Sequence, residues 1–381
     1  MTQVQVFLPI TRPCLSREEE EAVIEVIRSG WVSQGARVAA FEEAVASYVG
    51  ARYAVATSSC TTALHLALLY CGIGPGDEVI VPSFTFIATA NAVLHSGAKP
   101  VFVDIDRRTY NLDPAKVEEA VSPRTRAIIP VDQIGLPADL DAIQDIARRH
   151  GLHVVEDAAP AIGARYRGER VGSLSELTCF SFHARKVITT GEGGMITTNN
   201  EEMATQARIG RSHGASISDL ARHQANAVAI EEYPVLGFNY RMTDIQASIG
   251  IQQMQKLDWI LERRRTLGER YTAALGDIEG LEPPFVPPDV EHTYQSYCVR
   301  ITNGRHSRDE VMAAMMERHI ATRRGVMAIH LEPYYRRRFG AVSLPVTEEM
   351  ARTTLLVPLF PTMTEAEQDY VIESLRSVMI R

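Results

Sequence analysis

Short apolar segments recur along the first 200 residues, and segments with helical periodicity lie between them. The apolar segments are rich in β-branched residues, which is typical of strands buried on both faces of a parallel sheet. The predicted strands are Tyr53–Ala56, Glu78–Val81, Pro100–Val103, Ala127–Val131, His153–Val155, Cys179–Phe182 and Met195–Thr197. The predicted helices between them include Thr62–Tyr70, Ile87–Leu94, Pro114–Ala120 and Asp139–Arg149. This alternation predicts a doubly wound α/β domain, which binds ligands at the carboxyl ends of its strands.

The two ends of the chain carry other patterns. A capping box at Ser16–Glu19 predicts the start of an amphipathic helix, and Gly30 ends it. Residues 242–270 have the pattern of one long helix. The last part of the chain is predicted to contain a strand at Tyr297–Ile301 and a helix at Arg308–Arg318. We therefore expect a large domain over residues 1–250 and a smaller α+β domain over residues 251–381.

The composition excludes several classes of protein. The chain has 39 Lys and Arg against 47 Asp and Glu, a net charge of −8, which disfavours nucleic-acid binding because phosphates are bound mainly by clustered cations. No apolar run approaches the ~20 residues that cross a bilayer, and we see no signal peptide at the amino terminus. The five scattered cysteines form no C-x-x-C pair, so we expect reduced thiols, no metal site and a cytoplasmic location.

A lysine follows one of the predicted buried strands. It ends the segment Ser181-Phe182-His183-Ala184-Arg185-Lys186, and a glycine-rich turn comes shortly after it. Loops at strand ends often hold functional residues, but most lysines are solvated surface cations. Taken alone, Lys186 is therefore either a catalytic group or an ordinary surface charge.

Two further strand ends carry polar groups. His153–Ala159 contains the adjacent carboxylates Glu156 and Asp157, one of which must point inward because strand side chains alternate. Such a carboxylate could form an ion pair with a cationic ring nitrogen of a ligand. The alternative is that Asp157 caps the N-terminus of a following helix. Thr57–His65 is a hydroxyl-rich turn from a strand into a helix. Its free N–H groups suit a phosphate, although plain N-capping explains the same residues.

Together these three segments resemble the sugar aminotransferase family of the DegT/DnrJ/StrS type, which are pyridoxal phosphate (PLP) enzymes. The resemblance covers nearly the whole chain and includes Ser29–Gly35, Pro82–Asn91 and Gly237–Asp244. The order of phosphate turn, aromatic residue, Asp and Lys is similar to that of fold-type-I PLP enzymes. The resemblance therefore implies a large, mostly parallel sheet domain, a smaller C-terminal domain and PLP as cofactor.

The resemblance also implies a role for each matching residue. Lys186 would form the Schiff base with PLP and shuttle the proton between substrate and cofactor carbons. Asp157 would pair with the pyridinium nitrogen. The other implied PLP ligands are Phe86 on the ring face and, at the phosphate, Cys60, Thr61, Ser181 and Asn239 from a second subunit. The implied substrate ligands are Arg241, His330 and Tyr334.

Three of these residues have ordinary structural alternatives. Phe86 is otherwise a core aromatic, Arg241 an interface ion pair, and His330 a satisfied core or interface histidine. One position departs from the family pattern: Pro160 stands where a Gln or His usually reaches the phenolic oxygen of PLP. Proline has no side-chain donor and no N–H, so that oxygen needs another partner.

The predicted activity is transamination. We expect a homodimer, with its active site at the subunit interface, that aminates a nucleotide-linked keto-sugar with glutamate as donor. A perosamine-type 4-keto-6-deoxy sugar is the favoured substrate, on overall similarity. The alternatives are a PLP-dependent deoxysugar dehydratase, against which Lys186 argues because that subgroup has His there, and a PLP-fold regulatory protein without turnover.

Overall fold

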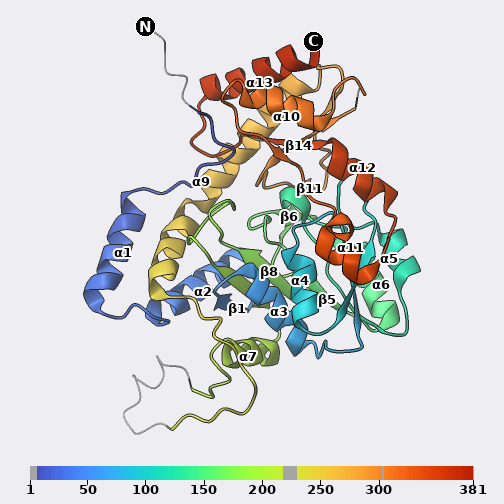
Figure 1. Cartoon of the computed structure of the whole chain (residues 1–381). Helices are drawn as coiled ribbons and strands as arrows, with labels where there is room; N and C mark the ends of the chain where they lie inside the picture. Colours follow the sequence, from blue (N-terminus) through green and yellow to red (C-terminus); the bar gives the residue numbers. More distant parts are fainter. Residues whose placement is uncertain (1–6, 218–229, 303, 381) are drawn as a thin grey trace.

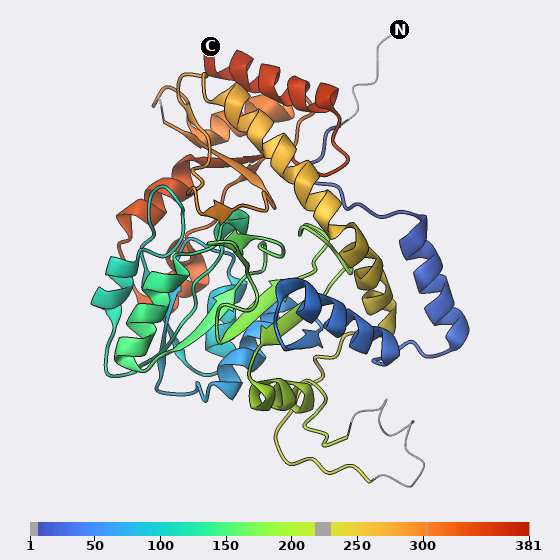
Figure 2. The same cartoon turned by 180° about the vertical axis from the view of Figure 1, so that it is seen from behind.

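A seven-stranded sheet forms the centre of the larger part of the molecule (Figures 1 and 2). The computed structural model describes residues 7–217, 230–302 and 304–380. The strand order is β1-β9-β8-β5-β4-β2-β3. The strands are β1 (Tyr53–Thr57), β2 (Glu78–Pro82), β3 (Lys99–Val103), β4 (Thr125–Ile128), β5 (His153–Asp157), β8 (Leu177–Ser181) and β9 (Gly194–Thr198). From β8 to β3 all neighbours are parallel, whereas β9 is antiparallel to both β1 and β8.

Helices cover both faces of this sheet. They are α2 (Ala36–Val49), α3 (Cys60–Tyr70), α4 (Ala88–His95), α5 (Pro114–Ala120), α6 (Leu140–His150) and α7 (Glu201–Gly210). Successive residues of β8 enter different cores: Cys179 packs with Leu64 of α3, whereas Phe180 packs with Phe41 of α2. Because both faces are buried, most strand residues are apolar, as the sequence pattern predicts, and polar exceptions such as Glu156 and Asp157 of β5 are buried too.

One long helix joins the two parts of the molecule (Figures 1 and 2). Helix α9 (Asp244–Leu275) packs beside the large sheet through Leu257 and enters the C-terminal core through Tyr271. The N-terminal helix α1 (Arg17–Ser29) packs against α9. Its capping box is present, since the Ser16 N–H donates to Glu19 Oε2 at 2.8 Å. The predicted long helix and the predicted N-terminal helix are both found.

The C-terminal part is a four-stranded antiparallel sheet with helices on it. The strand order is β10-β12-β14-β13, formed by β10 (Leu281–Glu282), β12 (Tyr297–Ile301), β14 (Thr354–Val357) and β13 (Arg323–Arg324). Helices α10 (Arg308–Met316), α12 (Pro345–Thr353) and α13 (Glu365–Ile380) belong to this part. Helix α11 (Pro333–Phe339) packs instead on the large part, where Tyr335 joins a core cluster with Ala90 of α4. A small sheet of β11 (Val290–Glu291), β6 (Arg165–Tyr166) and β7 (Glu169–Arg170) lies apart from both larger sheets. Residue 250 lies inside α9 and Leu8 packs in the C-terminal core, so the division at residue 250 stays a prediction.

The predicted fold class is confirmed, with one detail that the sequence does not show. A strand buried on both faces has the same apolar pattern whether it runs parallel or antiparallel to its neighbours. The sequence therefore does not reveal that β9 is antiparallel to β1 and β8. Among the described residues, no helix has both the length and the apolar content that a membrane crossing requires.

Candidate active site

A cavity of about 560 Å³ lies at the carboxyl end of the large sheet. Residues at or just after the ends of β2, β5 and β8 line one side of it, and residues 323–327 of the C-terminal part line the other. This is the position that a doubly wound fold favours for a ligand. The cavity brings together six of the predicted site residues: Cys60, Thr61, Phe86, Asp157, Ser181 and Lys186.

Asp157 is the last residue of β5 and is 5% exposed. Its Oδ2 accepts a hydrogen bond from Thr89 Oγ1 at 2.7 Å, and its Oδ1 accepts one from the Ala159 N–H at 3.2 Å. Burial raises the pKa of Asp157, and the Thr89 hydroxyl, the Lys186 charge and the Ala159 N–H oppose this rise. A buried carboxylate in this setting gains stability from a cationic group placed beside it in the cavity.

Lys186 lies on a tight loop between β8 and β9. Its N–H donates to His183 O at 2.8 Å, and the Phe182 N–H donates to Gly193 O at 2.9 Å across the base of the loop. Burial lowers the pKa of Lys186, while Asp157 and Cys60 act to raise it. A lowered pKa increases the share of neutral amine, which is the form that attacks a carbonyl.

The turn before α3 both caps the helix and leaves N–H groups open to a phosphate, the two roles that its sequence allows. Ser59 caps the helix, since its Oγ accepts the Thr62 N–H at 3.2 Å. Cys60 and Thr61 follow in the first helical turn, where N–H groups have no partner within the helix, and both line the cavity. Gly194 packs directly on this turn, because an added Cβ would lie 2.4 Å from the Ser59 carbonyl carbon. The result is a helix N-terminus open to an anion.

Phe86 presents its ring to the cavity. Its side chain is 57% exposed, whereas Phe84, two residues earlier, is fully buried. The alternative of a core aromatic therefore applies to Phe84 and not to Phe86. An exposed ring at a cavity wall is suited to stacking on a planar ligand.

Four predicted site residues do not line the cavity of this single chain: Asn239, Arg241, His330 and Tyr334. His330 is 3% exposed, and its Nδ1 lies 2.6 Å from Ser83 Oγ, as expected of a core histidine. Its Nε2 lies 3.5 Å from Glu348 Oε1 and has no hydrogen-bond partner among the described residues. The Tyr334 hydroxyl accepts a hydrogen bond from Arg338 at 3.0 Å. Asn239 is exposed and Arg241 is half-buried. The roles of these four residues stay predictions.

Several residues at the cavity escape sequence reasoning. Thr89, in the first turn of α4, donates to Asp157; it lies in the matching segment Pro82–Asn91, but the resemblance implies no role for it. Gln133 lines the cavity beside Pro160, and its Nε2 donates to Phe84 O at 2.5 Å. Arg185 lines the cavity as well. Gln133 follows a predicted strand end, and that position is the only signal its sequence offers.

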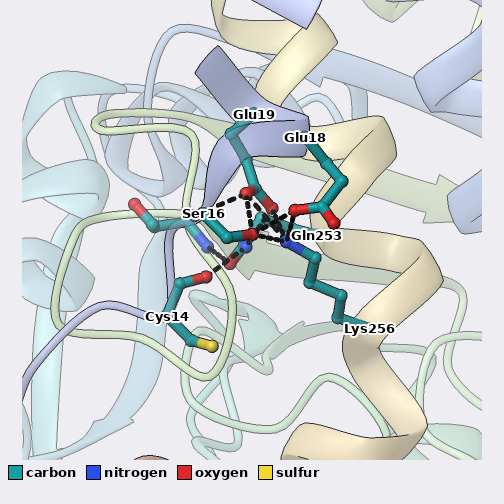
Figure 3. A network of polar contacts seen from close by, with 7 residues as sticks. Cys14, Ser16, Glu18, Glu19, Gln253 and Lys256 are labelled. Carbon is teal, nitrogen blue, oxygen red and sulfur yellow. Dashed lines mark hydrogen bonds and ion pairs between the residues drawn. The ribbon is translucent and has the colours of Figure 1, made fainter. Parts of the chain in front are cut away.

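A polar network outside the cavity joins the start of α1 to α9 (Figure 3), and through Gln253 it also contacts the Lys186 loop. Gln253 of α9 donates to Cys14 O at 2.7 Å and to Glu19 Oε1 at 2.8 Å, and its Oε1 accepts the Thr189 N–H at 3.3 Å. Lys256 lies 2.8 Å from both oxygens of Glu19. The network therefore fixes the loop to α9 and to the start of α1.

These groups fit PLP part by part. The Lys186 amine suits the aldehyde, the buried Asp157 carboxyl the ring nitrogen, the Phe86 ring the pyridine face, and the α3 N-terminus the phosphate. The fold and this donor set define a PLP-dependent aminotransferase. The DegT/DnrJ/EryC1/StrS aminotransferase family model matches residues 13–376, and the chain belongs to that family.

Relatives and solved structures agree with this membership. The spore coat polysaccharide biosynthesis protein SpsC of Bacillus subtilis is 41% identical over 378 residues, which are 98% of this chain and 97% of SpsC. DesV of S. venezuelae has a TM-score of 0.91 at 35% identity and covers 98% of this chain and 99% of its own. The PLP form of Spr1654 from Streptococcus pneumoniae has a TM-score of 0.92 at 28% identity, with the same coverage. The predicted family, enzyme class and cofactor are thereby confirmed.

Proposed function

We propose that the enzyme aminates the C4 ketone of a nucleotide-linked 4-keto-6-deoxy sugar, in a perosamine-type reaction, with glutamate as the amino donor. The observation that carries the proposal is the single cavity in which Lys186 and Asp157 meet residues 323–327 of the C-terminal part. The cavity of about 560 Å³ has room for a substrate beyond a cofactor. The polysaccharide role in the name of SpsC agrees with a sugar substrate.

The residues divide the work between them. PLP, when bound, supplies an electron sink for the substrate carbon joined to its amine. The Lys186 amine, whose pKa burial lowers, would take the proton from that carbon and deliver it to the neighbouring carbon of the cofactor. The Asp157 carboxylate keeps the ring nitrogen protonated. Arg185, Arg323 and Arg324 line the cavity, and guanidinium groups match the oxygens of a sugar diphosphate.

The test is product analysis on purified enzyme. It is incubated with glutamate and, in turn, GDP-, UDP- and dTDP-linked 4-keto-6-deoxy sugars, and the products are analysed by mass spectrometry and NMR. We expect one amino sugar, aminated at C4, for each glutamate consumed. Sugar conversion without consumption of the donor would instead indicate a dehydratase, and no conversion of any sugar would favour a regulatory protein.

Lys186→Ala provides the residue-level test. Loss of its proton transfer should lower turnover by roughly 10²–10⁴-fold, and the absorption of lysine-bound PLP should disappear. Lys99→Ala is the matched control, because Lys99 is an exposed lysine paired with Glu78 at the other end of the sheet. Normal turnover by Lys186→Ala would contradict the assignment.

We also propose that the enzyme is a cytoplasmic homodimer whose active site lies at the subunit interface. Asn239 is exposed and does not line the cavity of its own chain. Both facts fit a residue that reaches the phosphate site of a partner subunit. The same arrangement leaves Arg241, two residues further along, near that partner site.

A further inference from the structure

Two more carboxyl groups lie behind Asp157. Glu156 precedes it on β5, and Asp132 follows β4. The Asp132 N–H donates to Asp157 O at 3.1 Å and the Asp157 N–H donates to Pro130 O at 2.9 Å, so the two segments are paired at this level. Because side chains alternate along a strand, Glu156 points away from the cavity that Asp157 lines. Asp132 and Glu156 are both 0% exposed.

One oxygen of each carboxyl group has an ordinary donor. Asp132 Oδ1 accepts the Ala138 N–H at 2.9 Å, and Glu156 Oε2 accepts the Thr178 hydroxyl at 2.8 Å. The other two oxygens, Asp132 Oδ2 and Glu156 Oε1, are buried and have no hydrogen-bond partner among the described residues. The Ser175 hydroxyl, also buried and unpaired, lies near Glu156 and acts to lower its pKa.

Val131 pairs in parallel with Asp157 and both line the cavity, so the side chains of the neighbouring Asp132 and Glu156 leave the opposite face of the sheet together. Each of these two carboxyl groups acts on the pKa of the other.

Two ionised carboxylates cannot hydrogen-bond to each other, since both only accept. A single proton turns one of them into a donor and satisfies both remaining oxygens. We propose that Asp132 and Glu156 share one proton and together act as a positioning pair for Asp157, to which the Asp132 backbone is bonded. The role of the pair rests on the proposed function of Asp157, but the shared proton does not.

The surroundings favour the protonated pair. The titratable neighbours are Asp157 on the same strand and the Cys179 thiol on β8, and Lys186 acts on Asp157 from the cavity side. Among the described residues, no Lys, Arg or His forms an ion pair with Asp132 or Glu156. Burial raises the pKa of both groups. Repulsion by Glu156 and Asp157 adds to the rise at Asp132, and repulsion by Asp157 adds to the rise at Glu156, where the Asp132 contact acts in the opposite direction. The shared proton leaves the pair with one negative charge in place of two.

Infrared spectroscopy of the holoenzyme at neutral pH tests the proton directly. The C=O stretch of a protonated carboxyl group should be present in the wild-type enzyme and absent from Asp132→Asn and from Glu156→Gln. Both variants should fold, because an amide N–H replaces the shared proton. Glu42→Gln is the control, since Glu42 is a buried carboxylate ion-paired with Arg211 and should lose no such band. An unchanged band in both pair variants would overturn the shared proton.

Kinetics of the same set test the positioning role. Asp132→Leu removes the shared proton from Glu156 Oε1, and we expect kcat to fall at least about tenfold with little change in KM for glutamate. Asp132→Asn should restore most of that kcat, which a loss of packing alone would not predict. Wild-type kcat in Asp132→Leu would overturn the positioning role. A shared-proton band in a protein that converts no keto-sugar would leave this proposal standing and refute the proposed function instead.

Discussion

At the scale of single residues, Asp157 depends on Thr89, a neighbour for which the resemblance implies no role. The Thr89 hydroxyl donates to Asp157 Oδ2 at 2.7 Å and lowers the pKa that burial raises. Thr89→Val removes this donor, so the pKa of Asp157 should rise further. The ionised form would then be present only above a higher pH, and the acidic limb of the kcat profile should move to higher pH.

A hydrogen bond to a charged group is worth about 1.5–3 kcal/mol, so we expect PLP affinity of Thr89→Val to fall roughly 10–100-fold. The pH profile of kcat and the dissociation constant of PLP, followed by absorbance, measure both effects. Thr89→Ser is the matched control because it keeps the hydroxyl. A Thr89→Val profile that overlays that of Thr89→Ser would refute a role for this bond.

The sequence predicts the residues that would contact the cofactor at the strand ends. It does not predict the residues that hold those side chains in place. Lys186 and Asp157 are placed by motif order, and the structure brings both to one cavity. The resemblance implies that His330 binds substrate, yet Ser83 binds its ring in the interior. Sequence spacing does not reveal that contact, because it joins residues 247 positions apart.

At the scale of elements, the phosphate turn depends on β9. Gly194, its first residue, pairs with Thr57 of β1 and with Ser181 of β8. In Gly194→Ala the new Cβ would lie 2.4 Å from the Ser59 carbonyl carbon and oxygen, so the turn or the strand must move. We expect a loss of stability of about 1–3 kcal/mol and weaker PLP binding.

Thermal unfolding of the apo form and PLP titration of the folded variant separate these two effects. Gly74→Ala is the control, because the nearest atom to its added Cβ is 3.9 Å away and its backbone conformation is ordinary. Unchanged PLP affinity in Gly194→Ala would show that the turn tolerates this shift. The direction of β9, which makes the contact, could not be predicted, since a strand buried on both faces is apolar either way.

At the scale of the whole molecule, long-range contacts set the site more than local sequence does. The C-terminal part supplies residues 323–327 to the cavity, and α9 holds the Lys186 loop through Gln253. The periodicity of residues 242–270 predicts the helix but not its partners, because Glu19 and Gln253 are 234 positions apart. The sequence therefore predicts which residues line the site better than it predicts the long-range contacts that bring them together.

The proposed dimer can be tested by mixing two inactive variants, because each subunit would then supply the residue that the other lacks. Lys186→Ala and Asn239→Ala should each be nearly inactive alone. If Asn239 serves the partner's phosphate site, a mixed dimer contains one site with both residues intact. After the two variants have exchanged subunits at random, about half of the dimers are mixed, and each mixed dimer has one intact site of two. We therefore expect about a quarter of wild-type activity. Size-exclusion chromatography confirms that the mixed species is a dimer.

Mixing Lys186→Ala with Asp157→Ala is the control for this experiment. Both residues line the cavity of the same chain, so each site needs both from one subunit. In that mixture every site lacks one of the two residues, and activity should not return. Recovery with Asn239→Ala but not with Asp157→Ala would place Asn239 across the interface. Failure of both mixtures, with subunit exchange verified by differently tagged chains, would place Asn239 in its own subunit's site or outside any site.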